Sequence, residues 1–346
     1  MNMATRIQYY AQSAEEAKGR AFSVLFLIVF LLTSLAWTGQ VWGQTQLARV
    51  GILSFVSISD DAAPETWFLP FLRTLSDQGW VERKNVSFEY RSAHSDPARF
   101  AEAAKALVDL NVDVILAVGA PAVRAAHATT RTIPIVAADY TADPIANNYV
   151  ESYARPGGNV TGIFLDAPSI AGKWFELLQA MVPDLSHVAV LWDPSPGSNH
   201  LLAIRSVAKS LSILVQVVEV RKPDDLSPAF DGLSKQTQAV IILPSPMHYS
   251  YSAQLAGLAL KHRLPATSMA RAFAMTGGAL AYGPTEPATY ERSAVLVAKI
   301  LGGAKAANIP LERPTKLELV VNLDTAKTLG ITVPQSILLR ADGVIK

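Results

Sequence analysis

Two aspartates, Asp139 and Asp143, lie where a catalytic or ligand-binding group could be placed, because they flank Tyr140 directly after the apolar segment Ile133–Ala138. Two carboxylates at this spacing could act as an acid/base pair, or they could hold the ammonium group of a ligand. Asp143 precedes Pro144, so its carboxylate could instead cap the next helix, which the residue types slightly favour for Asp143.

A second candidate site is the turn Gly119-Ala120-Pro121, which follows the apolar run Val112–Val118 and opens an Ala-rich segment. This is the pattern of a buried strand that turns into a helix. Pro121 suits the first helical turn because its φ is already helical and its missing N–H would have no partner there. The helix start would direct backbone N–H groups and the positive end of the helix dipole beyond the strand, which predicts a place for an anionic group.

Further polar candidates follow a predicted strand in the second half of the chain. Ser195, Ser198 and Asn199 come after His187–Trp192, where another helix should begin. They could contact a ligand at the edge of a sheet, or they could cap that helix. Tyr282 and the tyrosine between the two aspartates could stack on a planar ligand, or they could pack as ordinary aromatic residues.

Other chemistries lack their sequence signatures. The chain has no G-x-G-x-x-G, no Walker loop, no G-x-S-x-G and no H-E-x-x-H. The six histidines are scattered without metal-ligand spacing, and the chain has no cysteine, which excludes disulfides, thiol catalysis and thiolate metal sites. We therefore expect no catalytic residues, no metal and no cofactor.

The candidates fall on a regular alternation of strands and amphipathic helices. This βαβ alternation predicts an α/β fold with two doubly wound parallel-sheet lobes, in which ligands bind at the carboxyl ends of the strands. The strands are expected at Val50–Ser54, Val86–Tyr90, Val112–Val118 and Ile133–Ala138 in the first half, and at His187–Trp192, Val215–Val220, Ala239–Leu243, Ala279–Gly283 and Lys316–Asn322 later.

Length and charge limit the organisation of the chain. Its 346 residues suffice for roughly two domains. The segment Arg155–Gly162 lies between the halves, and its glycines suit a hinge, although an ordinary turn explains them equally well. The part after Gly278 is too short for a third domain, so it should return to complete both lobes. With 30 Lys and Arg against 29 Asp and Glu there is no basic excess, and nucleic acid is not an expected partner.

The N-terminus has the pattern of an export signal. Arg6, Lys18 and Arg20 precede the uncharged apolar run Ala21–Ala36, and Val41-x-Gly43 provides a small-residue cleavage site. This predicts a secretory signal peptide over residues 1–43 and a periplasmic mature protein. The alternative is an uncleaved membrane anchor, since about 20 apolar residues can span a bilayer.

Four long phrases closely resemble the ABC transporter substrate-binding proteins of the group that includes tryptophan- and tyrosine-binding members. The similarity runs from about Arg49 to Lys346 and keeps the family's order. The phrases are GWVERKNV at 79–86, ARPGGNVTG at 154–162, GKWFELL at 172–178 and PTKLELVVNLDTAK at 314–327.

The resemblance implies a type 1 periplasmic-binding-protein fold, with two lobes joined by a three-crossover hinge and one small molecule held between them. We expect lobe 1 to comprise residues 46–157 and 284–313, and lobe 2 residues 158–283 and 314–346. Transferred onto this sequence, the ligand contacts are expected at Ser54, Gly119, Ala120, Pro121, Asp139 and Asp143 from the first lobe, Ser198, Asn199 and Ser245 from the second, and Tyr282 near a crossover. Tyr140, the stacking candidate between the two aspartates, is expected to join them.

The resemblance also implies a function without turnover. The protein is expected to be a monomer that captures a small, anionic or aromatic molecule and delivers it to an ABC permease. Amino-acid-binding members carry an acidic residue near Ser245, whereas this strand ends in LPSPM at 243–247, which argues against an α-amino acid held there. Two alternatives remain open: a ligand-sensing subunit for a membrane receptor, and a two-lobed transferase-like enzyme.

Overall fold

The computed structural model describes residues 47–55, 68–93, 96 and 98–346, and residues 47–346 form one compact unit. The expected signal peptide lies outside the described residues. No helix in the described part is long and apolar enough to cross a bilayer.

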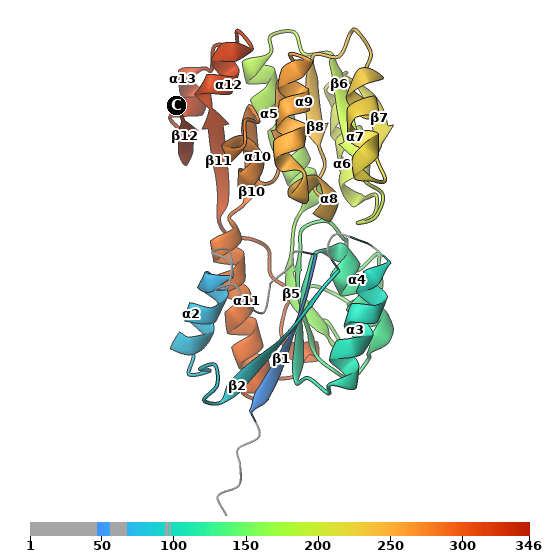
Figure 1. The fold of residues 1–346 in the computed structure, drawn as a ribbon, viewed down its shortest axis with the longest axis vertical. Helices are drawn as coiled ribbons and strands as arrows, with labels where there is room; N and C mark the ends of the chain where they lie inside the picture. Colours follow the sequence, from blue (N-terminus) through green and yellow to red (C-terminus); the bar gives the residue numbers. More distant parts are fainter. Residues whose placement is uncertain (1–46, 56–67, 94–95, 97) are drawn as a thin grey trace, which may run out of the picture. The chain divides into compact units, whose positions relative to one another are not determined.

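The first lobe is built on a five-stranded parallel sheet with the strand order β2-β1-β3-β4-β5. Figure 1 shows α2 and α11 on one side of this sheet and α3 and α4 on the other. The elements are β1 (Ala48–Ser54), α2 (Leu69–Asp77), β2 (Val86–Ser92), α3 (Arg99–Asp109), β3 (Val114–Val118), α4 (Ala120–Thr129), β4 (Ile135–Asp139), β5 (Val160–Phe164) and, from much later in the chain, α11 (Glu286–Leu301) and η2 (Ala306–Asn308).

Helices on both faces explain why β3 consists entirely of apolar residues. Its side chains alternate between two cores, with Ile115 and Ala117 among α3 and α4, and Leu116 among α2 and α11. A strand covered on both faces has no polar face to show, so its sequence is a continuous apolar run.

The second lobe contains a seven-stranded sheet with the order β12-β11-β10-β9-β8-β6-β7. All neighbouring strands run parallel except β10 and β11, which are antiparallel. The elements are α5 (Ala167–Met181), β6 (His187–Trp192), α6 (Asn199–Ser210), β7 (Leu214–Glu219), η1 (Pro223–Asp225), α7 (Leu226–Asp231), β8 (Ala239–Ile242), α8 (Pro246–Ser250), α9 (Ser252–Lys261), β9 (Ala266–Ser268), α10 (Arg271–Met275), β10 (Leu280–Pro284), β11 (Leu317–Asn322), α12 (Leu323–Thr328), α13 (Gln335–Leu338) and β12 (Gly343–Ile345).

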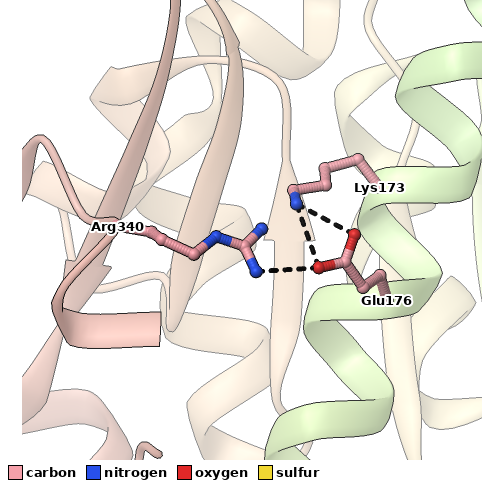
Figure 2. A network of polar contacts seen from close by, with 3 residues as sticks. All are labelled: Lys173, Glu176 and Arg340. Carbon is pink, nitrogen blue, oxygen red and sulfur yellow. Dashed lines mark hydrogen bonds and ion pairs between the residues drawn. The ribbon is translucent and has the colours of Figure 1, made fainter. Parts of the chain in front are cut away.

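The sheets differ from the sequence expectation at their edges. The antiparallel β11 and the three-residue β12 make the second sheet mixed rather than purely parallel. Arg340, close to the C-terminus, lies beside α5, where Figure 2 shows the Glu176 carboxylate between Arg340 and Lys173. Arg340 Nη1 lies 2.9 Å from Glu176 Oε1, and Lys173 Nζ lies 2.9 Å from Glu176 Oε2. Exposed ion pairs of this kind contribute little to stability, so the buried contacts of Ile337 must hold most of this segment.

The chain crosses between the two sheets three times within the described residues: after β5, after β10 and before β11. The crossovers lie beside one another, because Phe164 N–H donates to Glu312 O over 2.9 Å and Thr285 N–H donates to Lys316 O over 3.0 Å. Three adjacent extended segments can change their backbone angles together, which suits a hinge.

The hinge does not lie at Arg155–Gly162, and the lobe boundary expected after residue 157 falls too early. This segment leads into β5, which pairs with β4 inside the first sheet, so the chain leaves the first lobe only after Phe164. Gly162 has φ +138°, and a Cβ there would lie 2.2 Å from Ala137 O. The glycine is therefore required for close approach of two strands, not for a hinge.

Candidate functional site

A pocket lies between the two sheets, where strand ends of both lobes meet. It encloses about 940 Å³ of empty space, part of which is open solvent at its mouth. Its lining is mainly apolar and aromatic with a few polar side chains, as small-molecule pockets usually are. The lining residues are Phe55, Val118, Gly119, Ala120, Ala138, Tyr140 and Thr141 from the first sheet, Pro244, Ser245, Pro246, His248, Tyr249, Ser268, Met269 and Ala270 from the second, and Pro284, Glu286 and Tyr290 from the second crossover and α11.

The first lobe contributes the start of α4. Gly119 is the N-cap, with φ +87° and ψ 156°, and Ala120 is the first helical residue. The amides of Ala120 and Ala122 belong to the first turn, where no preceding helical carbonyl can accept from them. This end of α4 is thus a suitable place for an anionic group of a ligand.

The second lobe contributes the start of α8. Ser245 is its N-cap, and Ser245 Oγ accepts from the His248 N–H over 3.0 Å. His248 Nδ1–H donates to Leu243 O over 2.7 Å, which leaves Nε2 as an acceptor, and Nε2 has no partner among the described residues. Burial lowers the pKa of His248, so the ring is held in its neutral form.

Aromatic side chains bring the two lobes into contact at the pocket. The ring of Phe55, which follows β1, meets the ring of Tyr249 in α8 edge-on, with 5.6 Å between centroids. Such aromatic pairs contribute about 0.5–1.5 kcal/mol beyond their buried area.

Glu286 is the acidic residue of the pocket lining, and it lies in the first turn of α11. Its Oε2 accepts from the Tyr249 hydroxyl over 3.3 Å. No lysine, arginine or histidine of the described residues forms an ion pair with it. Burial raises the pKa of Glu286, and the nearby Glu318 raises it further, while the Tyr249 hydrogen bond acts in the opposite direction.

Tyr140 joins the first lobe to the second. Its carbonyl oxygen accepts from His200 Nε2 in α6 over 2.6 Å. Burial lowers the pKa of His200 to about 4, so this imidazole is neutral at physiological pH. Arg124 in α4 makes another contact between the lobes, donating to Ser195 O over 3.1 Å and to Pro196 O over 3.3 Å.

Of the residues expected at the site, the structure brings Gly119, Ala120, Tyr140 and Ser245 together in the lining of this pocket. The other expected residues do not line it. Ser54 and Pro121 are buried beside it, while Asp139, Asp143, Ser198, Asn199 and Tyr282 serve other contacts or face elsewhere.

The two aspartates stabilise turns. Asp139 is fully buried, and its Oδ1 accepts from Thr141 N, Thr141 Oγ1 and Ala142 N. Asp143 is exposed, and its Oδ1 accepts from Ile145 N and Ala146 N. Its carboxylate therefore caps the backbone that follows it, as one of the two sequence interpretations proposed. Neither carboxylate lines the pocket, so the arrangement does not support an acid/base pair there.

The remaining expected contacts are not part of the lining. Ser198 is the exposed N-cap of α6, and Asn199 is the first residue of that helix. Tyr282 lies on β10, where its carbonyl oxygen accepts from Trp174 Nε1 over 2.9 Å and its ring lies 6.0 Å from Lys173 Nζ.

Sequence reasoning missed Phe55, His248, Tyr249, Glu286 and Tyr290. One available signal was Ser245-Pro246, because a capping serine followed by a proline is typical of a helix start and predicts α8. For Glu286 the signal was Thr285-Glu286-Pro287 directly after a strand. The described residues include no cluster of His, Cys, Asp or Glu that could hold a metal ion.

Two α/β lobes with three crossovers and a pocket between their strand ends define a type 1 periplasmic-binding-protein-like fold. Within this class the chain belongs to the family described as ABC transporter substrate binding protein, whose model matches residues 49–345.

Individual relatives have low sequence identity to this chain but align with most of its length. The chain is 23% identical over 263 residues to the tyrosine-binding protein of Clostridioides difficile, covering 75% of each chain. A conserved domain protein from Vibrio cholerae has a TM-score of 0.79 and 24% identity, and a Streptococcus pneumoniae ABC domain in complex with L-Trp has a TM-score of 0.77 and 22% identity. Both structures cover 86% of this chain and are themselves matched over 100% of their length.

Proposed function

We propose that this protein is the extracytoplasmic solute-binding component of an ABC importer, which captures a small molecule in the pocket and presents it to a membrane permease. The single observation that carries the proposal is that residues of both lobes, among them Ala120 and Tyr249, line one pocket beside a three-segment hinge. A ligand that contacts both lobes stabilises the closed form through contacts that the open form lacks.

The ligand we propose has an aromatic or apolar body and an acidic group. The aromatic rings that line the pocket suit the body, and the start of α4 at Gly119 and Ala120 suits the acidic group. Two relatives are described as tyrosine-binding and as a complex with L-Trp, which makes aromatic amino acids the first compounds to test.

The proposed localisation is the periplasm. The chain would be exported by a signal peptide over residues 1–43, which is then removed. We propose that the mature chain acts as a monomer without a cofactor or metal. The family supports an extracytoplasmic role with a permease as partner.

Titration calorimetry on the purified mature chain tests the proposal, with aromatic amino acids and their deaminated acids as probes. Ala120→Leu places extra atoms at the lining and should weaken any bound probe at least tenfold, whereas Ala128→Leu, exposed on the same helix, should not. A probe bound equally well by all three proteins would contradict a site at the start of α4. Turnover of a bound probe would contradict a pure binding function.

A further inference from the structure

Glu286 is unusual among the lining residues because it is a half-buried carboxylate with no ion-pair partner among the described residues. The pocket that it lines is also lined by Phe55, Tyr140, Tyr249 and Tyr290. Tyr249 provides a hydrogen bond, but its length of 3.3 Å exceeds the roughly 2.5–3.0 Å that is usual between two oxygen atoms. In the described part of the chain no cationic side chain forms an ion pair with this carboxylate.

Such a group is costly unless a positive partner neutralises it. Burial raises the pKa of Glu286, because removal from water destabilises the ionised form of the carboxylate. The first turn of α11 favours the ionised form, since the helix dipole is positive there. An exposed glutamate would serve the helix dipole equally well at no desolvation cost, so helix stabilisation does not explain why this side chain lies in the pocket.

We propose that Glu286 is the binding residue for a protonated nitrogen of the ligand, an ammonium or amidinium group attached to an apolar or aromatic body. The inference rests on the proposed function and names the ligand class of the same pocket. The surrounding rings add a second attraction, because aromatic faces attract cations, most strongly when water is excluded. Glu286 comes from α11 and not from the strand end at Ser245, so the lack of an acidic residue at Ser245 does not exclude a cationic ligand.

Matched probes separate the cation from the rest of the ligand. Each pair shares its ring and differs in the amine: L-tryptophan with indole-3-propionate, L-tyrosine with 3-(4-hydroxyphenyl)propionate, and tyramine with 4-ethylphenol. Calorimetry compares the mature wild-type chain with Glu286→Gln, which keeps the size of the side chain and removes its charge. Glu291→Gln, exposed on the same helix, is the control variant.

We expect at least one amine to bind the wild-type chain at least tenfold more tightly than its deaminated partner. Glu286→Gln should reduce that preference to less than threefold, and Glu291→Gln should leave it unchanged. The affinity of the amine should also fall as the pH is lowered through the pKa of Glu286, because protonation removes the charge, and Glu286→Gln should lack this dependence.

Equal preference for the amine in wild-type and Glu286→Gln protein would overturn the role of Glu286. Deaminated probes that bind while every amine fails would overturn the cationic ligand class and leave solute capture intact. If no probe binds, the cationic class is overturned for aromatic ligands, and a thermal-shift screen of a broad nutrient mixture then decides separately whether the protein captures a solute at all. Far-ultraviolet circular dichroism verifies that each variant is folded.

Discussion

At the scale of single residues, Gly119 lines the pocket and has a backbone conformation that other residues rarely adopt. Its φ of +87° and ψ of 156° lie in a region essentially reserved for glycine, although a Cβ there would meet Phe55 only at 3.7 Å. The space is therefore available, and the obstacle is the backbone conformation itself.

We predict that Gly119→Ala lowers the free energy of unfolding by about 1–3 kcal/mol, since the alanine must adopt this strained conformation. Gly172→Ala is the control, because Gly172 lies inside α5 with nothing within 4 Å of an added Cβ. This variant should gain about 0.5–1 kcal/mol from higher helix propensity. Urea denaturation measures both, and an equal response of the two variants would refute the assignment of strain to Gly119.

His200 should make the stability depend on pH. Burial holds its folded-state pKa at about 4, below the ordinary value of 6.5, so the unfolded chain binds a proton that the folded chain does not. The stability is therefore fully present above about pH 6.5 and is lost as the pH falls toward 4, by up to about 3 kcal/mol.

His200→Gln can keep a donor for Tyr140 O and cannot titrate, so the difference in unfolding free energy between this variant and the wild-type chain should shrink or reverse between pH 7 and pH 4.5. His187→Gln, at the partly exposed start of β6, is the matched control for the loss of a histidine. If the difference in unfolding free energy between His200→Gln and the wild-type chain stays constant over this range, protonation of His200 does not destabilise the folded state, and the prediction is wrong. Chemical denaturation at several pH values provides the measurement.

At the scale of elements, the sequence predicted those strands whose environment is simple. The buried strands β3, β4, β6 and β8 are apolar runs covered on both faces, so their residue types are sufficient to identify them. The strand at Lys316–Asn322 was also expected, and it is β11, but its antiparallel pairing with β10 was not. The three-residue edge strand β12 was missed, because it pairs only after the chain has returned from the other lobe, which no local pattern encodes. Likewise, the start of α4 was predictable from Gly119-Ala120-Pro121, whereas Glu286 enters the pocket only because the second crossover passes beside it.

The loop after β6 should control lobe closure through Arg124, the α4 side chain that donates to Ser195 O and Pro196 O of the second lobe. Arg124→Gln removes these contacts, and because Arg124 is exposed the loss should be only about 1 kcal/mol, or roughly fivefold weaker ligand binding. Arg205→Gln, on the exposed side of α6, should bind with wild-type affinity. Calorimetry with a probe that binds the wild-type chain tests this, and equal affinities of the two variants would argue against a closing role for the contact.

At the scale of the whole molecule, the three crossovers allow the lobes to separate with little disturbance of either core. Each lobe has hydrophobic clusters of its own, whereas the contacts between lobes are a few aromatic and polar pairs at the pocket, such as Phe55 with Tyr249 and His200 with Tyr140. Interfaces of this limited kind exchange between open and closed states at modest cost, and a ligand that touches both sides shifts the balance.

We therefore predict that a bound probe reduces the radius of gyration of the mature chain in small-angle X-ray scattering, because it favours the closed form. The same probe should raise the melting temperature as its concentration exceeds the dissociation constant, since it binds only the folded state. At the same probe concentration Ala120→Leu should show smaller changes in both quantities, whereas Ala128→Leu should match the wild-type chain. A probe that raises the melting temperature without reducing the radius would mean that the lobes are already closed before binding, and that the permease must distinguish the loaded protein by something other than its shape.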